Sequence, residues 1–136
     1  MTSYLTDTTV LIDHIRGQTS ATRFISQNRP YISIVCQAEL IQGSKDKSSL
    51  ILNQKLCEKL NIIPISERTS LLAIRLISEH FLSHHLEFLD ALIAATAINL
   101  SLTLVTSNAK HFSFIPNLQL RAWQDIEKTL KSTATN

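Results

Sequence analysis

Residues 5–13 read Leu5-Thr6-Asp7-Thr8-Thr9-Val10-Leu11-Ile12-Asp13 and lead from a short strand through an acidic turn into a helix. The strand is expected at residues 4–6, and the helix from Val10 to Arg16, where Gly17 ends it. Similar junctions recur along the chain, because short strand-like runs alternate with segments of helical periodicity. This alternation predicts parallel strands connected by helices.

The remaining segments extend this pattern over most of the chain. Pro64 places the third strand near a sheet edge or at a strand end, because proline cannot donate to a central ladder. Residues 89–99 are apolar nearly all round, which predicts a buried helix. The expected strands are residues 4–6, 31–34, 61–65, 102–105 and 118–123, and the expected helices are residues 10–16, 21–27, 35–43, 48–60, 67–81, 89–99 and 125–131.

These elements predict a three-layer α/β/α sandwich around a central, mainly parallel sheet of four to five strands. Residues 1–131 are expected to form a single domain, and residues 132–136 a frayed C-terminal tail. In open parallel sheets the functional site lies beyond the carboxyl ends of the strands. The residues that follow each strand are therefore the first candidates for catalytic or binding roles.

The composition excludes several function classes. With 44% hydrophobic and 18% charged residues, the chain does not resemble a disordered protein. Two glycines, Gly17 and Gly43, are too few for a Gly-rich phosphate loop. A net charge of +2 permits a nucleic-acid partner without requiring one. Cys36 and Cys57 build neither a zinc site nor a disulfide framework, and we expect them to be buried free thiols.

The expected location is the cytoplasm. The start of the chain, residues 1–4, has neither the basic nor the apolar region of a signal peptide. The longest apolar stretch, residues 91–100, is too short to span a bilayer. We therefore expect a soluble protein without a membrane partner.

Three acids occur where strands hand over to helices. Asp7 follows the first strand directly, Glu39 lies one turn into the helix after the second, and Asp90 begins the most apolar helix. Each has an alternative explanation. Asp7 and Asp90 could simply cap helices, a position that aspartate favours, and Glu39 could lie solvated on an outer helix face. The combination of three acids at strand ends, more than any one of them, indicates a site.

Three carboxylates at one crevice would repel each other unless protons, basic groups or a cation neutralised them. Oxygen ligands without thiolate or imidazole suit Mg²⁺ or Mn²⁺. A Mg²⁺ ion held by a few carboxylates keeps several waters, and one of them can attack a phosphodiester. The acids therefore predict metal-dependent hydrolysis.

The motifs around these acids resemble those of the PIN-domain family, and their size and order look most like its VapC-type toxins. The fourth motif resembles the family pattern Val-Thr-x-Asn-x-Lys-His-Phe. The resemblance covers nearly the whole chain, with its motifs in order. The four stretches that carry it are residues 5–13, 32–40, 89–97 and 104–112.

This resemblance implies an endoribonuclease dependent on Mg²⁺ or Mn²⁺. Asp7, Glu39 and Asp90 would be the metal ligands and, with Asn108, the catalytic residues. Asn108 stands where the family often has an aspartate, so we expect weaker metal binding and one tightly held ion rather than two. A water activated by the metal would attack the phosphorus in line, leaving 5′-phosphate and 3′-hydroxyl ends.

Three further residues are candidates for supporting roles. The hydroxyl of Thr8 or Thr106 could orient a carboxylate. Arg16 could hold a substrate phosphate, although it is more often a solvated helix residue. His111 lies near the expected site, where a structural role at a turn is favoured over a role as a base.

The resemblance also implies partners. A small VapB-like antitoxin would place a segment in the acidic groove, perhaps with an arginine among the carboxylates. The substrate is expected to be single-stranded or loop RNA. Toxin homodimers are usual in the family, so a homodimer is expected as well.

Other functions remain open. The fold could persist without catalysis, as a scaffold or RNA-binding protein, and Asn108 permits that interpretation. A receiver-like phosphoacceptor would need an acidic pair after the first strand, where Asp7 stands alone. His80 and His84 are four residues apart, as zinc ligands on a helix would be, with His85 beside them, but no third ligand is evident.

Overall fold

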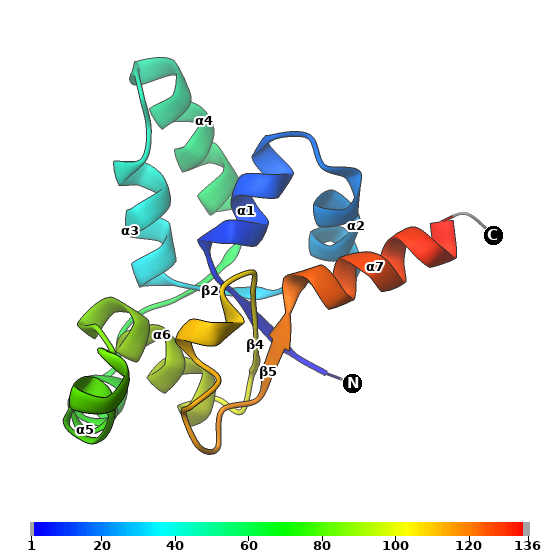
Figure 1. The fold of residues 1–136 in the computed structure, drawn as a ribbon. Helices are drawn as coiled ribbons and strands as arrows, with labels where there is room; N and C mark the ends of the chain where they lie inside the picture. The colour runs from blue at the N-terminus through cyan, green and yellow to red at the C-terminus, as the bar shows by residue number, and fades with distance from the viewer. Residues whose placement is uncertain (1, 135–136) are drawn as a thin grey trace.

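The computed structural model describes residues 2–134, which form five strands and seven α-helices, with a pair of helices between each two of the first four strands (Figure 1). A short 3₁₀ helix, η1, follows the fourth strand. The elements in chain order are β1 (Tyr4–Thr6), α1 (Thr8–Ile15), α2 (Thr19–Asn28), β2 (Tyr31–Ser33), α3 (Ile34–Gln42), α4 (Lys47–Glu58), β3 (Asn61–Ile63), α5 (Glu67–His84), α6 (Phe88–Asn99), β4 (Thr103–Thr106), η1 (Ala109–His111), β5 (Leu120–Ala122) and α7 (Trp123–Ala134).

All five strands are parallel and lie in the order β3-β2-β1-β4-β5. β1 is central, with Leu5 opposite Tyr31 of β2 on one side and opposite Leu104 of β4 on the other. β3 is an edge strand and ends at Ile63, directly before Pro64. This confirms the position that the proline predicted, because an edge strand needs no donor at that residue.

The sheet separates two packed layers of helices. Leu104 and Val105 are neighbours in β4 yet belong to different buried clusters, because successive side chains of a strand point to opposite faces. Val105 packs with residues of α1, α2 and α7, whereas Leu104 lies in the larger cluster with α3, α5 and α6. The expected three-layer α/β/α architecture is therefore confirmed.

Helix α6 lies at the centre of the larger cluster. Residues 91–97 are all buried, as the apolar pattern predicted. Three of these residues, Ala91, Ala94 and Ala95, are fully buried alanines. Because their side chains are small, α5 and the sheet can approach α6 closely. Enlarging such a residue forces neighbours apart at a cost of about 1–3 kcal/mol. The packing therefore fixes α6, and with it Asp90 in its first turn.

Several helices begin at the residue after a strand because that residue caps them. Asp7 accepts a hydrogen bond from the amide of Thr9 at 3.0 Å, and Ser33 accepts one from the amide of Val35 at 3.1 Å. Such caps stabilise a helix by about 1 kcal/mol each. The short junctions aim the first turns of α1 and α3 over the carboxyl ends of β1 and β2.

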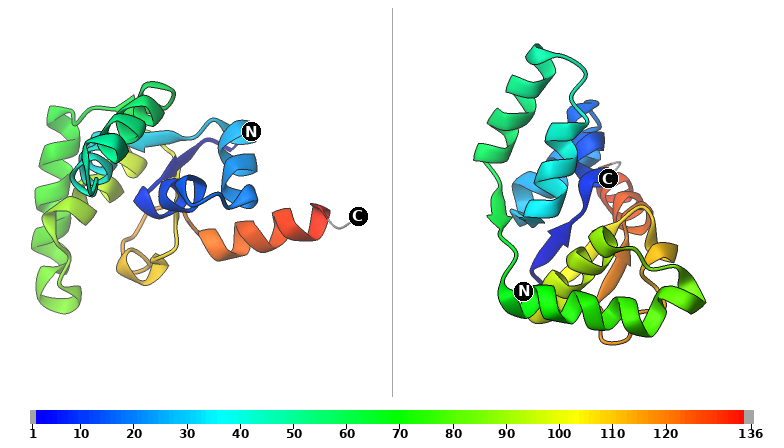
Figure 2. Two further views of the ribbon diagram at one scale, coloured as in Figure 1. Left: turned by 90° about the horizontal axis from the view of Figure 1, so that it is seen from above. Right: turned by 90° about the vertical axis from the view of Figure 1, so that its left-hand side faces the viewer.

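One pair of helices and the last helix extend beyond the sheet (Figure 1). α3 and α4 form an antiparallel pair, and α7 runs outward to the C-terminus in Figures 1 and 2. α7 is anchored at its start by Trp123, whose Nε1 donates to Asp13 of α1 at 2.9 Å. It continues to Ala134, three residues beyond the predicted end at Lys131, and the rest of the predicted tail, residues 135–136, lies outside the described residues.

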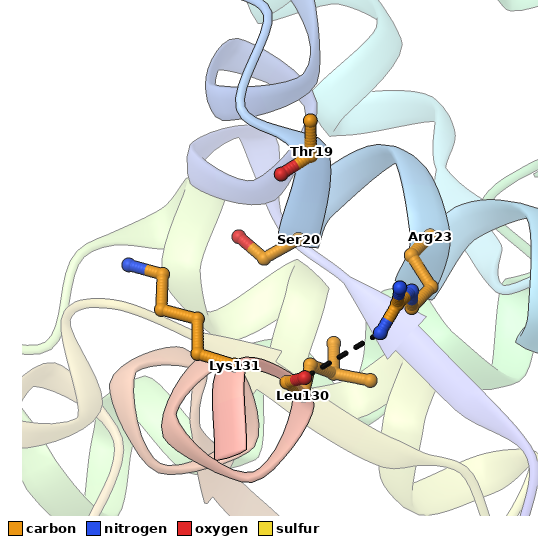
Figure 3. A pocket seen from close by; sticks show the side chains of 5 residues that line it. All are labelled: Thr19, Ser20, Arg23, Leu130 and Lys131. Carbon is orange, nitrogen blue, oxygen red and sulfur yellow. Dashed lines mark hydrogen bonds between the residues drawn. The ribbon is translucent and has the colours of Figure 1, made fainter. Parts of the chain in front are cut away.

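α2 and α7 enclose a small hollow of about 60 Å³ (Figure 3). Arg23 of α2 donates to the main-chain oxygen of Leu130 at 3.4 Å, and Ser20 donates to Glu127 at 2.7 Å. Lys131 lies 3.7 Å from the same Glu127 carboxylate. These bonds fasten α7 to α2, and we assign the hollow to packing. Within residues 2–134, none of the helices has the length and apolar character needed to cross a membrane.

Candidate active site

The candidate site lies at the carboxyl ends of β1 and β4, which are neighbours in the sheet although far apart in sequence. From β1 the chain winds outward through β2 to β3, and the later strands β4 and β5 add to the other side. Ligand crevices of open parallel sheets form at such a reversal. Asp7 follows β1 directly and Asn108 lies two residues after β4, so both stand at this point.

Asp7 is the most buried acid of the site, with 7% of its surface exposed. Its Oδ1 accepts hydrogen bonds from the amide of Thr9 at 3.0 Å and from the Thr9 hydroxyl at 2.5 Å, while its Oδ2 accepts from the Thr106 hydroxyl. Burial raises the pKa of Asp7, and the hydrogen bonds from Thr106 and Thr9 oppose that rise. Asp7 therefore caps α1 and is also held in one orientation facing the crevice.

Glu39 and Asp90 lie close enough to Asp7 for its negative charge to raise their pKa values. Partial burial raises the pKa of Glu39, and the negative charges of Asp90 and Asp7 raise it further. Burial likewise raises the pKa of Asp90, with additional contributions from Glu87 and Asp7, while His111 opposes the rise. The three acids predicted from the sequence thus form one electrostatic cluster at the strand ends.

The alternative roles of these acids can now be judged. The N-cap of α6 is Glu87, and Asp90 lies in the first helical turn, where an acid interacts favourably with the helix dipole. Glu39 is exposed on α3, as the alternative interpretation expected, but its pKa shows that the exposed face borders the other two acids. Glu39 can therefore be exposed to solvent and still belong to the acid cluster.

His111 faces Asp90 from η1. Its Nδ1 lies 3.7 Å from Oδ2 of Asp90, and 62% of the His111 side chain is exposed. A histidine that served only as packing would be more enclosed. The structure therefore places His111 at the rim of the crevice, where it can reach a bound substrate.

Within residues 2–134, no three His, Cys, Asp or Glu side chains stand close enough together to form a ready-made metal site. The donor chemistry nevertheless suits a divalent cation. Asp7, Glu39 and Asp90 offer only oxygen atoms, and their raised pKa values record a cost of ionisation that a cation would relieve. The residues therefore fit such an ion once the side chains of Glu39 and Asp90 turn inward.

The supporting residues take different positions. Thr106 orients Asp7, whereas Thr8 lies against the buried Cys36 thiol on the other side of the turn. Arg16 ends α1 and lines a groove of about 300 Å³ that also includes Glu39. The main-chain N–H of Asn108 donates to the Thr106 hydroxyl at 2.9 Å, and its own side chain is exposed.

The histidines of α5 are arranged for ring packing. His84 stacks on Phe114 with ring centroids 4.1 Å apart and an angle of 8° between the planes. His80 packs on the same ring, with 5.2 Å between centroids. Among the described residues, no cluster of three potential metal ligands includes these histidines.

The sequence matches the PIN domain over residues 4–116. This chain belongs to the PIN-domain family. It is also 31% identical over 121 residues to Ribonuclease VapC19 of Mycobacterium tuberculosis, an alignment that covers 85% of this chain and 96% of that protein. The resemblance seen in the sequence motifs is therefore confirmed.

Solved structures of PIN-domain toxins share the fold. A toxin–antitoxin complex from Klebsiella pneumoniae matches with a TM-score of 0.71 and 30% identity, covering 85% of this chain and 95% of that chain. VapBC2 from Rickettsia felis, bound to a promoter DNA fragment, matches with a TM-score of 0.71 and 28% identity over 88% of this chain and 98% of that chain. PIN-domain VapC nucleases are generally dependent on divalent metals.

Two residues of this PIN domain's site were missed or given little weight in the sequence. Thr9 donates hydrogen bonds to Asp7 from both its main-chain amide and its hydroxyl. The sequence permits this local pattern wherever a threonine follows an aspartate by two residues. The sequence placed His111 near the site but favoured a structural role at a turn, because its approach to Asp90 depends on the path of η1.

Proposed function

We propose that this protein is a Mg²⁺- or Mn²⁺-dependent endoribonuclease and the toxin component of a type II toxin–antitoxin pair. The observation that carries the proposal is the presence of Asp7, Glu39 and Asp90 at one edge of the sheet of a PIN domain, where the negative charges of Asp90 and Asp7 raise the pKa of Glu39 and that of Asp7 raises the pKa of Asp90. Its 31% identity to a ribonuclease over most of both chains supports the same activity. The reaction is hydrolysis of an RNA phosphodiester bond.

Each residue of the site has its own role in the proposed reaction. Asp7, held by Thr9 and Thr106, supplies a carboxylate in a fixed orientation. Glu39 and Asp90 supply two further, more exposed carboxylates, and all three would hold the ion. A bound divalent cation supplies charge stabilisation at the phosphate and an activated water. The Asn108 amide orients groups at the crevice without adding charge, which favours one tightly held ion.

The groove beside Glu39 fits an antitoxin segment. It lies between α1, α3 and α4 and is lined by apolar residues, among them Ile12, Ile15 and Leu40, and by Arg16 and Glu39 at its polar end. We propose that a VapB-like antitoxin lays an apolar segment in this groove and sets a basic side chain among the carboxylates. Complexes of similar toxins with antitoxins support this partner.

A homodimer is proposed as well. Helix α5 forms an outer edge of the molecule in Figures 1 and 2 and exposes large apolar residues. Leu71, Ile74 and Leu82 are 65%, 55% and 92% exposed. Exposed apolar side chains gathered on one outer helix are typical of protein interfaces. We further propose that residues 1–131 act as a single PIN domain, working in the cytoplasm on single-stranded or loop RNA.

The test is an Asp90→Asn variant assayed on single-stranded RNA with Mn²⁺. Asparagine keeps the shape of the side chain and removes its charge, so we expect cleavage to disappear while circular dichroism stays unchanged. Asp125→Asn, on the exposed face of α7, is the matched control and should cleave normally. Cleavage by Asp90→Asn at the wild-type rate would show that Asp90 does not hold the metal.

An inactive scaffold is the competing function. Inducible expression in a bacterial host separates the two, since a ribonuclease toxin arrests growth and a scaffold does not. Arrest should vanish with Asp90→Asn and with co-expression of the antitoxin. Unchanged growth on expression of the wild-type protein, together with absence of cleavage in vitro, would favour the scaffold.

A further inference from the structure

A second hollow adjoins Asp90 on the side away from the antitoxin groove. It measures about 370 Å³ and lies between the end of α5, the start of α6 and the segment after β4. Asp90 and His111, which belong to the candidate site, form one of its walls. The remaining lining includes His84, Lys110 and Phe114, to which the proposed reaction assigns no role.

The first feature of this hollow is a pair of stacked rings. His84 lies parallel to Phe114, with 4.1 Å between ring centroids. His80 packs beside this pair, with ring centroids 5.2 Å from Phe114 and 6.3 Å from His84, and only 15% of its side chain is exposed. His84 itself is exposed, so one end of the stack is supported by the protein and the other faces solvent. Such a platform accepts another flat ring by stacking.

The second feature is positive charge. Lys110 is exposed in η1 and makes no ion pair with any residue among positions 2–134. An exposed cation beside a stacking platform provides for both parts of a nucleotide, the base and the phosphate. A peptide partner would not need a flat platform and a cation together at the edge of a nuclease site.

We propose that this hollow is the subsite for an RNA nucleotide next to the scissile phosphodiester. The base of that nucleotide stacks on the His84–Phe114 pair, and Lys110 binds the phosphate that follows it. His111 and Asp90 line the same hollow, 3.7 Å apart, so the RNA strand would pass from the subsite to the acid cluster along this wall. The inference rests on the proposed function, because it names where the substrate of that same site is held.

The contribution of the subsite to RNA binding can be measured separately from cleavage. His84, Lys110 and Phe114 touch no carboxylate in the cluster, and their roles need no metal. RNA binding can therefore be measured with a chelator present, where cleavage cannot occur. Stacking is worth about 1–3 kcal/mol per base, so loss of the platform should raise the dissociation constant about five-fold or more.

The experiment measures binding of a fluorescein-labelled, single-stranded 12-nucleotide RNA by anisotropy at low salt with EDTA, the RNA length being roughly that covered by single-strand binders. His84→Ala should weaken binding about five-fold or more, whereas His84→Phe, which keeps a flat ring, should bind like the wild type. Lys110→Gln should weaken binding and reduce the salt dependence by about one phosphate contact. Lys128→Gln, on α7, is the matched control and should change neither.

A second readout uses the unmodified protein. RNA that carries 2-aminopurine at each position in turn should show fluorescence quenching at one position, because a stacked base loses emission. His84→Ala should restore that emission. Equal binding by wild-type and His84→Ala proteins, or the absence of a quenched position with the wild type, overturns the subsite. Loss of antitoxin binding instead of RNA binding in the Lys110→Gln variant overturns it too.

The outcomes distinguish this inference from the ribonuclease proposal. A wild-type protein that leaves RNA intact with Mn²⁺ but binds it through His84 and Lys110 refutes the nuclease and retains the subsite. A wild-type protein that cleaves RNA, with His84→Ala and Lys110→Gln variants that bind and cleave equally well, refutes the subsite and retains the nuclease.

Discussion

Thr106, the last residue of β4, donates its hydroxyl hydrogen to Oδ2 of Asp7, the residue that follows β1. The two residues are 99 positions apart in the sequence. The same hydroxyl oxygen accepts the main-chain N–H of Asn108 at 2.9 Å. One buried threonine thus connects the most buried acid of the site to the loop that carries Asn108 and His111.

Replacing Thr106 by valine should therefore reduce both the activity and the stability of the protein. Valine has the same shape but cannot hold Asp7, and loss of such a supporting hydrogen bond typically costs 10–100-fold in metal affinity or activity. Stability should fall by about 1–3 kcal/mol, since Asp7 and the Asn108 amide lose a partner. Cleavage rates at increasing Mn²⁺ and urea unfolding measure the two effects. Thr106→Ser keeps the hydroxyl and should restore activity; equal rates for the valine and serine variants would contradict the role.

Converting Asn108 to aspartate should tighten metal binding. The substitution adds a fourth negative charge at an exposed position beside the cluster, and the affinity of oxygen sites for divalent ions rises with ligand charge. The concentration of Mn²⁺ that gives half-maximal cleavage should fall. In the metal-free protein the same change should lower the melting temperature, because the added charge repels the other acids. A Mn²⁺ requirement unchanged by Asn108→Asp would place position 108 outside the metal site.

The metal-free protein should lose stability as the pH rises through the acidic range. Burial raises the pKa values of Asp7, Glu39 and Asp90 above their ordinary values of 3.8 for aspartate and 4.5 for glutamate. Raised acid pKa values mean that the folded state binds protons more tightly than the unfolded state. The free energy of unfolding therefore falls as the pH rises from these ordinary values through the raised ones.

Thermal unfolding of the wild-type protein and Asp90→Asn, both with EDTA, isolates this contribution. The variant lacks one of the repelling charges. The melting temperature of the variant minus that of the wild type should therefore increase as the pH rises from about 4 to 7, the window in which raised carboxyl groups titrate. Added Mn²⁺ should reduce the difference by stabilising the charged wild-type cluster. A difference independent of pH would mean that Asp90 titrates as it does in the unfolded chain.

Cys36 should be chemically inert in the folded protein. Burial raises the pKa of its thiol to about 12, with Asp7 and Glu39 adding to the rise and hydrogen bonding to Thr8 opposing it. Since the thiolate is the nucleophile, alkylation by iodoacetamide at about pH 8, near the ordinary thiol pKa, should be slow until the protein is unfolded. Peptide mass spectrometry separates Cys36 from Cys57, which is also buried. Rapid native-state labelling of Cys36 would disprove the enclosure.

Local patterns were sufficient for most of the fold. The all-round apolar character of residues 89–99 predicted the burial of α6, and Pro64 predicted the end of β3 at a sheet edge. Boundaries were less accurate, as α7 shows, because a helix end depends on what the last turns pack against. For α7 these contacts come from α2, more than 100 residues earlier.

The candidate site was predictable only in part. The three acids carry a local signal, since each lies in an apolar setting, Asp7 and Glu39 after a strand and Asp90 in the first turn of α6. The stack of His84 on Phe114 carries none, because 30 residues and a helix separate the two rings in the chain. At the sequence level the same histidines had a competing zinc interpretation, and only their packing on Phe114 gave them another role.

The sequence by itself determined the alternation of strands and helices, the buried helix and the acids at the strand ends, because these depend on periodicity and on neighbours within a few residues. The tertiary structure alone decided that β4 lies beside β1, that Thr106 reaches Asp7, and that His84 and Lys110 share a hollow with Asp90. The physical reason is that the backbone hydrogen bonds of a parallel sheet join strands distant in sequence, so packing of the whole chain chooses which residues meet.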